Sequence, residues 1–382
     1  SIMAALVLNE EQQMLKDAAK RFLSESAPVS QLRALRDSRD ETGFSRELWQ
    51  SMVEMGFVGT LIPEALGGAQ FGYVGMGQVS EQAGRNLSAS PLISTAIGGV
   101  AALLLAGSSE QQQALLPQVA EGSLLLALAV DEAPRHAPNR VATRLQETDG
   151  GYLLNGRKTF VVDGHVADKL IVSARSAGAE ADQAGISLLL VDRNAPGVSV
   201  ERTIMADSRN AAIVSFDNVT VSSGDLLGEA GNAWAALELT LDVVNAQLAG
   251  ELLGLSLEVF ERTVAYLQER KQFGVTLSTF QALQHRCAHL FSELELVKSA
   301  VLKAQMALDA GDAEAAQWVS LAKAKACEVA ELATNEAVQM HGGMGMTDEF
   351  DIGLFMKRAR SVQTLFGDYR YHANRFAALR GY

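Results

Sequence analysis

The chain has 382 residues, too many for one ordinary hydrophobic core, so we expect two or three packed units. Its 48% hydrophobic and 20% charged residues are typical of a soluble globular protein. The net charge of −13 disfavours nucleic acid and anionic membrane surfaces as partners, because binding to phosphates requires clustered Lys and Arg.

Residues 1–122 are predicted to form an N-terminal helical domain. Asn9 followed by Gln12 is the pattern of a capping box, and apolar residues then recur at helical spacing. Ser45 predicts the N-cap of a second helix, and PEALGG at 63–68 predicts a break in the chain. Further helices are expected at about 91–106 and 109–121.

Residues 123–228 are predicted to form a central β-domain. Short runs rich in β-branched residues, such as KLIVSA and AAIVSF, alternate with Gly, Asn and Asp. Their regular spacing favours an antiparallel barrel or sandwich.

Residues 229–382 are predicted to form a C-terminal four-helix bundle, which makes the fold class α+β. The helical runs are long, and glycines stand at the joints between them. The expected helices are about 231–270, 280–309, 312–340 and 351–378.

The two cysteines, Cys287 and Cys327, lie in helical runs, which favours free thiols in a reducing compartment over a disulfide. The N-terminal apolar run is about six residues long and lacks a basic start, so we do not expect a signal peptide. Uninterrupted apolar runs stay well below the roughly 18 residues of a membrane span. We therefore expect a cytoplasmic protein without membrane insertion.

Two motifs in the last domain are the main candidates for a binding site. In ERKQFG (269–274), Arg270 stands near a predicted helix end, where a cation also suits the helix dipole. In QMHGGMGM (339–346), the glycines can end a helix, and they can also let the backbone approach a ligand. Taken alone, each motif is explained by helix termination.

Together with four further segments, these motifs resemble the acyl-CoA dehydrogenase family over essentially the whole chain. The other matching segments are IPEALGG (62–68), SSEQQQALLPQVAEG (108–122), GGYLLNGRKTFVVDG (150–164) and FDNVTV (216–221). The resemblance implies the three-domain fold described above and α,β-dehydrogenation of an acyl-CoA thioester. It also implies FAD as cofactor, electron-transfer flavoprotein or another oxidant as partner, and a homo- or heterotetramer.

The resemblance also implies the cofactor site, in which FAD lies between the β-domain and the C-terminal bundle. An Arg suits pyrophosphate because its guanidinium is planar and donates several hydrogen bonds. The implied residues are Arg270, Gln272, Phe273 and Gln281 at the adenine end, Gln339, Gly342 and Gly343 from a neighbouring subunit, and Phe160 at the flavin ring.

The polar contacts of the flavin ring are depleted relative to the family pattern. Phe160 stands where the family usually has Trp, and Val162 replaces a usual Thr or Ser. The segment 129–140 lacks the family's Thr-Glu-Pro and Ser-Asp turn.

The usual catalytic base is missing. Many family members carry Glu-Gly after a basic run that resembles KRAR (357–360), and Phe366 and Gly367 stand there in this chain. Other members place the base where Val244 stands, next to an Arg that binds the acyl-CoA and is Asn245 here. Neither Phe nor Val can take the α-proton. Asp242 and Asn245 remain as candidate substrate-binding residues.

Two carboxylates are candidate substitutes for the base, whereas a third, Asp242, is two residues from Val244 and faces away from that position. Glu251 shares a helix face with Val244 but lies roughly 10.5 Å further along the axis. It stands in an apolar run and therefore needs a partner, such as an Arg at a subunit interface, or a raised pKa. Asp368 is two residues beyond Phe366, about 200° round a continuous helix, so it points away unless the backbone there is not helical.

Two functions stay open. The chain can be a flavin enzyme with an unusual base, and its FGD…H ending (Phe366 to His372) resembles bacterial members that act on bulky or steroid-like acyl-CoAs. It can also be a base-lacking partner subunit that lends FAD contacts across the interface of a heteromer. A flavin oxidase or monooxygenase on the same fold has no positive support.

His285, His289 and Glu293 share one helix face, a spacing that can hold a metal. Because no HExxH motif accompanies them, a solvated or packing face is favoured, and no metal is expected.

Overall fold

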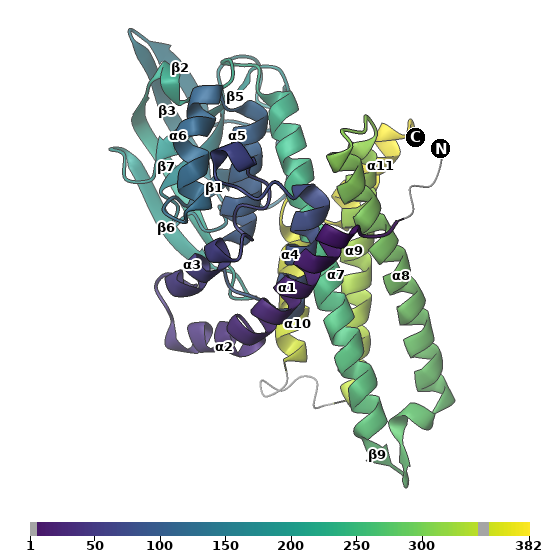
Figure 1. Ribbon diagram of the computed structural model, residues 1–382. Helices are drawn as coiled ribbons and strands as arrows, with labels where there is room; N and C mark the ends of the chain where they lie inside the picture. Colours follow the sequence, from purple (N-terminus) through teal and green to yellow (C-terminus); the bar gives the residue numbers. More distant parts are fainter. Residues whose placement is uncertain (1–5, 343–350) are drawn as a thin grey trace. The chain divides into compact units, whose positions relative to one another are not determined.

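The computed structural model describes residues 6–342 and 351–382, which group into two compact units (Figure 1). The helical unit comprises the residues up to Ala34, Tyr73–Ser88 and Asn245–Tyr382. The sheet unit comprises Leu35–Gly72 and Ala89–Val244. The three-domain division at residues 122 and 228 stays a prediction.

The helices of the sheet unit begin and end close to the predicted positions. The Ser45 side chain accepts the Leu48 N–H at the start of α3, as predicted for an N-cap. The break at 63–68 is a single 3-10 turn. The elements are α2 (Val29–Ser38, shared between the units), α3 (Arg46–Glu54), η1 (Glu64–Leu66), η2 (Leu92–Gly99), α5 (Val100–Ala106), α6 (Ser109–Ala120) and η3 (Ser223–Asp225).

One eight-stranded sheet forms the centre of this unit, in the order β6-β7-β3-β2-β4-β5-β8, with β1 paired to β4. The strands are β1 (Leu126–Ala129), β2 (Arg144–Thr148), β3 (Gly151–Lys158), β4 (Lys169–Arg175), β5 (Ile186–Asp192), β6 (Val198–Ile204), β7 (Asn210–Val221) and β8 (Leu226–Leu227).

The predicted antiparallel arrangement is wrong for two pairings, because β1 and β2 both run parallel to β4. All four residues of β1 are buried, and η2 packs against this strand. Parallel strands are typically covered on both faces, which explains the continuous apolar run LALA in place of an alternating pattern.

Lys158, the last residue of β3, has no exposure to water. The Lys158 ammonium donates to the Val130 carbonyl at 3.0 Å, the Glu132 carboxylate at 2.8 Å and the Ser173 hydroxyl at 2.9 Å. Burial lowers the pKa of Lys158, and the charge of Glu132 works against that shift. Glu132 also accepts the N–H groups of Ala142 and Thr143, so this pair fixes the segment that follows β1.

The helical unit is built mainly from long helices. The Asn9–Gln12 capping box at the start of α1 is confirmed. α9 packs against α8, α10 and α11, and Figure 1 shows α8 and α9 side by side. The elements are α1 (Glu10–Ser26), α4 (Gly72–Asn86), α7 (Trp234–Glu269, shared between the units), β9 (Lys271–Gln272), β10 (Val275–Thr276), η4 (Leu277–Thr279), α8 (Gln281–Asp309), α9 (Ala315–His341), α10 (Ile352–Thr364) and α11 (Tyr369–Leu379).

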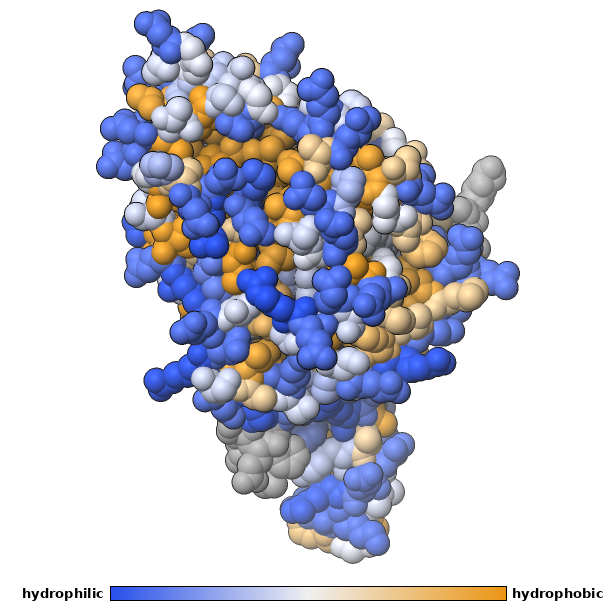
Figure 2. Space-filling view, turned by 60° about the vertical axis from the view of Figure 1, so that its left-hand side comes forward, coloured by the Kyte–Doolittle hydropathy of each residue, from blue (hydrophilic) through white to orange (hydrophobic). Residues whose placement is uncertain are grey.

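By length and composition, α7 could cross a membrane, although no uninterrupted apolar run pointed to it. Its most apolar window is 78% buried inside the protein, which is typical of the core helix of a globular fold. On the face shown in Figure 2, polar side chains cover most of the surface, and apolar side chains show between them in several places.

Glycines let α4 and α7 approach each other closely within the helical unit. A Cβ on Gly84 would lie 2.1 Å from the Glu251 carbonyl oxygen, and a Cβ on Gly254 would lie 1.9 Å from the Glu81 carbonyl oxygen. Because both obstacles are backbone atoms, no side-chain movement can make room. The two helices can keep this distance only with glycine at both positions.

We predict that Gly254→Ala destabilises the protein by roughly 2 kcal/mol or more, because the helices must separate. The matched control is Gly353→Ala on α10, where a Cβ would meet nothing within 4 Å and φ is not positive. That control should change the free energy of unfolding by less than about 0.5 kcal/mol, or stabilise slightly. Urea unfolding measures both variants, and equal effects would contradict the close packing of α4 and α7.

Candidate functional site

The turn between α10 and α11 carries the position expected for the base. The continuous helix predicted over 351–378 is wrong, because α10 ends at Thr364 and α11 begins at Tyr369. Phe366 has φ +54° and Gly367 has φ +107°, values that a right-handed helix cannot accommodate. A Cβ on Gly367 would lie 2.6 Å from His372 Nε2, so the turn needs glycine at this position.

Asp368 is the N-cap of α11, so the estimate of 200° round a continuous helix does not apply. Its carboxylate accepts the Tyr371 N–H at 2.8 Å, and the residue is exposed. An N-cap carboxylate satisfies a free N–H group and suits the positive end of the helix dipole. The side chain therefore has a structural role that requires no catalysis.

Buried side chains hold three successive backbone carbonyls of this turn. The fully buried Lys323 ammonium donates to the Leu365 carbonyl at 2.7 Å and to the Gly367 carbonyl at 2.9 Å. It also contacts Asn245 Oδ1 at 3.2 Å. Burial lowers the pKa of Lys323, while Cys327, Asp368 and Glu251 act to raise it.

The carbonyl between these two, that of Phe366, accepts from Asn245 Nδ2 and from His372 Nε2, both at 3.0 Å. Since a carbonyl only accepts, Nε2 carries the proton, and His372 Nδ1 is left to accept from the Ser320 hydroxyl at 3.0 Å. Arg375 donates to the same hydroxyl oxygen at 2.8 Å.

The predicted substrate-binding residues are both buried. Both polar ends of the Asn245 amide are engaged with Lys323 and Phe366, which gives this side chain a role in holding the turn. Asp242 lies in the part of α7 that belongs to the sheet unit and is also buried. A contact of either residue with substrate stays a prediction.

Glu251 has an arginine partner in its own chain. Its Oε1 lies 3.7 Å from Nη1 of Arg358, the second basic residue of the KRAR run. The side chains are 13% and 3% exposed, respectively. A buried cation of this kind needs a nearby anion, so Glu251 neutralises Arg358 without a subunit interface.

The residues expected at the adenine end of FAD lie on the surface at one end of the helical unit. Arg270 directly follows α7 and is exposed, and no ion pair engages its guanidinium within residues 6–342 and 351–382. Phe273 at the tip of the β9–β10 hairpin has φ +57° and is 86% exposed. Figure 2 shows this tip at the bottom of the view with mostly polar side chains.

Contacts between the helix ends bring the second half of the predicted set to the same place. Tyr266 of α7 stacks on His341 of α9, with ring centroids 4.2 Å apart. Arg286 of α8 forms a two-pronged ion pair with Glu336 of α9 at 2.6 and 3.0 Å. The exposed residues Gln272, Gln281, Gln339 and Gly342 therefore gather at this end, whereas Gly343 lies outside the described residues.

An open cavity of about 230 Å³ lies between the end of α7 and the start of α8, beside the hairpin. Its lining includes Leu267, Gln268 and Gln284. An exposed guanidinium, exposed amides and a glycine backbone at the same end of the helical unit fit the pyrophosphate and adenine of a dinucleotide.

Phe160, expected at the flavin ring, belongs to the sheet unit. It follows β3, is 39% exposed and has φ +51°. Val162 is buried, so it contributes packing and no polar contact. In the segment that lacks the family's polar turn, His136 contacts the Asp131 carboxylate at 2.8 Å. Phe160, Phe273 and Phe366 all adopt left-handed backbone, which is costly for aromatic residues and is often found at functional sites.

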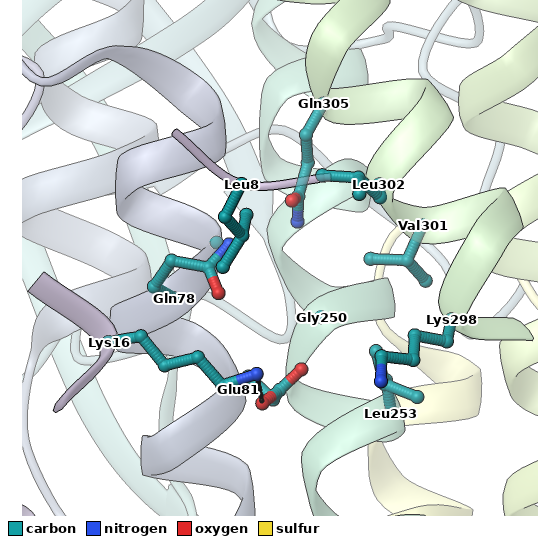
Figure 3. Close-up of a pocket in the computed structure, with 11 residues that line it drawn as sticks. Leu8, Lys16, Gln78, Glu81, Gly250, Leu253, Lys298, Val301, Leu302 and Gln305 are labelled. Carbon is teal, nitrogen blue, oxygen red and sulfur yellow. Dashed lines mark ion pairs between the residues drawn. The ribbon is translucent and has the colours of Figure 1, made fainter. Parts of the chain in front are cut away.

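A second, smaller cavity of about 50 Å³ lies among α1, α4, α7 and α8 (Figure 3). Lys16 and Glu81 point toward each other across one side, with 3.5 Å between Nζ and Oε2. Gln78 and Gln305 add amide groups to the lining. This space can hold a few water molecules but not an acyl chain or a flavin.

The histidine face on α8 shows no sign of a metal centre in the described part of the chain, where no three His, Cys, Asp or Glu side chains converge. The Glu293 carboxylate instead pairs with Lys325 at 2.7 Å. Both cysteines are free thiols as predicted, although Cys287 is only half-buried. Burial raises the pKa of Cys327 to about 11.

Sequence reasoning missed the role of Lys323, although a signal was present. Lys323 stands four residues after Val319 and three before Ala326, on the face of α9 that is apolar. A lysine inside an apolar stripe must find oxygen partners when the helix packs. Its actual partners lie far away in the sequence, so no local pattern could name them.

Known proteins resemble this chain in sequence and in fold. Models of the N-terminal, middle and C-terminal domains of acyl-CoA dehydrogenases match residues 9–123, 134–219 and 231–378, respectively. A 3-(aryl)acrylate reductase of Clostridium sporogenes is 27% identical over 94% of this chain and 95% of its own length. The CarC subunit of the caffeyl-CoA reductase-Etf complex of Acetobacterium woodii is 27% identical over 91% of this chain and 92% of its own.

Among solved structures, a variant of the Tcur3481-Tcur3483 steroid ACAD superposes with a TM-score of 0.87. It is 30% identical in sequence, and the match covers 97% of this chain and 98% of that one. Since the three domain models follow one another along the sequence and the folds agree over nearly their full length, this chain belongs to the acyl-CoA dehydrogenase family.

Proposed function

We propose that this chain is the flavin-holding subunit of an acyl-CoA dehydrogenase in which another chain supplies the α-proton base. The family consists of flavoprotein oxidoreductases that act on acyl-CoA. One observation carries the finer proposal: both carboxylates that could replace the missing base already have structural partners. Glu251 neutralises Arg358, and Asp368 caps α11.

The reaction needs a base at hydrogen-bond distance from the α-proton of the thioester. Phe366 offers an apolar ring at the usual position, and Val244 at the alternative position is equally unable to accept a proton. Recruiting Glu251 would take a nearby anion away from a guanidinium that is only 3% exposed. That cost argues against Glu251 as the base.

The cofactor-side residues support a role in holding FAD. Arg270, Gln272, Phe273 and Gln281 would bind its adenine and pyrophosphate, and Gln339 with Gly342 and Gly343 would complete the site across an interface with a neighbouring subunit. When bound, FAD supplies the acceptor for the hydride that leaves the β-carbon. Phe160 would pack its ring against the flavin without a hydrogen bond.

The relatives suggest the class of substrate and the partners. The similarity to a steroid enzyme and to an arylacrylate reductase favours a bulky or cyclic acyl group. The Etf complex of the CarC relative favours electron-transfer flavoprotein as the oxidant. We therefore propose a heterotetramer in which this chain lends FAD contacts and its partner chain contributes the carboxylate.

The second candidate is a chain that dehydrogenates acyl-CoA by itself, with Glu251 as an unusual base. The place of Glu251 on the same face of α7 as Val244, the alternative base position, favours it. Its position on α7 would then require an unusual substrate pose.

The flavin content of the purified protein tests the cofactor role. We expect little flavin absorbance from the chain expressed alone, and close to stoichiometric flavin after co-expression with a dehydrogenase chain that carries the base. In that complex, Arg270→Ala should weaken flavin retention about tenfold or more, because a charged hydrogen bond to pyrophosphate is lost.

The matched control is Lys271→Ala, which removes an exposed charge from the neighbouring position of the same hairpin. Flavin retention there should stay within about twofold, since a lysine that points to solvent contributes little. If both variants lose flavin equally, Arg270 has no specific role. If the chain alone is fully flavinated and an acyl-CoA bleaches it, no second chain is needed.

Two substitutions at Asp368 separate a helix cap from a catalytic base. Asp368→Ala should lower the free energy of unfolding by about 1 kcal/mol, whereas Asp368→Asn should retain most of the stability because Asn is also a good N-cap. Neither should change turnover in an active preparation. Loss of turnover in Asp368→Asn with unchanged stability would identify the carboxylate as a base after all.

Restoring a carboxylate at the empty position tests the assignment of that position. In the flavin-loaded complex, with the base carboxylate of the partner chain replaced by an amide, Phe366→Glu should make acyl-CoA bleach the flavin at least about tenfold faster than without this substitution, because a base then reaches the α-proton. Glu251→Gln should leave this gain unchanged. A Phe366→Glu protein that binds flavin and acyl-CoA but does not react would contradict the assignment, and inactivation by Glu251→Gln would support the second candidate.

A further inference from the structure

We propose that Lys323, Asn245 and His372 are positioning residues that hold residue 366 in one fixed orientation, so that the geometry of the base position persists although its side chain is phenylalanine. That residue 366 stands at the base position rests on the function proposed above. The positioning itself rests on contacts inside the helical unit.

The backbone carbonyls around residue 366 are directed into the protein. Those of Leu365, Phe366 and Gly367 follow one another, and all three accept hydrogen bonds from buried side chains. Three successive carbonyls in a surface turn would ordinarily bond to water. With all three bound inside, the peptide planes on both sides of residue 366 are fixed, and so is the direction of its Cα–Cβ bond.

The backbone of this turn is strained at residue 366. A phenylalanine at φ +54° is disfavoured by its Cβ, and the following Gly367 sits in a conformation that L-residues rarely adopt. A strained conformation persists only where the surroundings over-determine it. Four hydrogen bonds from Lys323, Asn245 and His372 to the carbonyls of this turn, and a fifth between Lys323 and Asn245, supply that constraint.

The buried charge of Lys323 also constrains the turn. Lys323 is fully buried, and its ammonium touches two carbonyl oxygens and one amide oxygen. Glu251, Asp368 and Cys327 face it at longer range. If the ammonium were removed, the inward carbonyls would lose their donor, and the turn would have to open toward water to satisfy them.

The ring of His372 is itself oriented by further side chains. The Ser320 hydroxyl on Nδ1 fixes the tautomer that donates from Nε2, and Arg375 holds the hydroxyl from the other side. Side chains from α7, α9 and α11 thus converge on one three-residue turn. Packing alone would not need so many polar groups with defined directions.

Hydrogen exchange of the full-length protein, followed by mass spectrometry, tests the proposal. In Lys323→Met, a peptide that covers residues 364–371 should exchange about tenfold faster or more than in the unmodified chain, while peptides from α8 change much less. The matched control is Lys158→Met, which removes the other fully buried ammonium but lies in the sheet unit.

The control should loosen the sheet unit and leave the 364–371 peptide unchanged. The proposal is overturned if this peptide exchanges no faster in Lys323→Met than in Lys158→Met. It is also overturned if exchange accelerates equally throughout the helical unit, because Lys323 would then act only on overall stability.

If Lys323→Met does not fold, the variant Asn245→Asp tests the proposal instead. This variant keeps an oxygen toward Lys323 but loses the N–H donor to the Phe366 carbonyl. Faster exchange confined to residues 364–371 is expected, and unchanged protection would overturn the proposal.

An activity readout separates this proposal from the proposed function. In the Phe366→Glu background, adding Asn245→Asp should lower kcat about tenfold with KM nearly unchanged, because a misplaced base slows proton transfer without weakening binding. An unchanged kcat would overturn the positioning role. If Phe366→Glu itself shows no reaction, the proposed function fails, while hydrogen exchange still decides whether the turn is held.

Discussion

Each unit of this protein is organised around an ammonium group that has lost all contact with water. Burying such a cation is costly unless oxygen atoms surround it. Lys158 gathers a carbonyl, a carboxylate and a hydroxyl, and thereby joins β3 to β4 and to the segment after β1. Lys323 gathers two carbonyls and an amide oxygen, and thereby joins α9 to α7 and to the turn between α10 and α11.

In the helical unit, the consequence is a strained turn whose carbonyls are bound by buried side chains. Phe366 occupies a strained backbone conformation in which every neighbouring carbonyl is held from within. A turn that had simply lost its function would be expected to relax to a cheaper conformation. Its preservation agrees with a subunit whose architecture is still needed while the proton transfer takes place elsewhere.

The distribution of charges favours the same division of labour. Within the helical unit, Glu251 and Asp368 already serve Arg358 and the start of α11. By contrast, Arg270 and the hairpin around Phe273 are exposed to solvent. Groups that are engaged internally stabilise the fold, and groups that are left exposed at one end are available to a cofactor or a neighbouring chain.

The sequence by itself determined the family and the order of helical and β segments, and it predicted the loss of the base. The Asn9 capping box and the Ser45 cap were predictable because a cap and its target are three residues apart. Phe366 was predicted to stand at the base position because it follows the basic run and precedes a glycine. These features depend on neighbours along the chain or on a motif in fixed register.

Only the tertiary structure decided which polar groups meet. Asn245 and Phe366 are 121 residues apart, and Lys323 and Asn245 are 78 apart, so no helical or strand period connects them. The break at 365–368 was missed although Gly367 and Asp368 are typical of a helix end and of a new N-cap, respectively. The donors that pull its carbonyls inward come from α7, α9 and α11. A buried lysine can be noticed in a sequence, but its oxygen partners become known only when the distant segments pack, because burial and not local propensity creates the need for them.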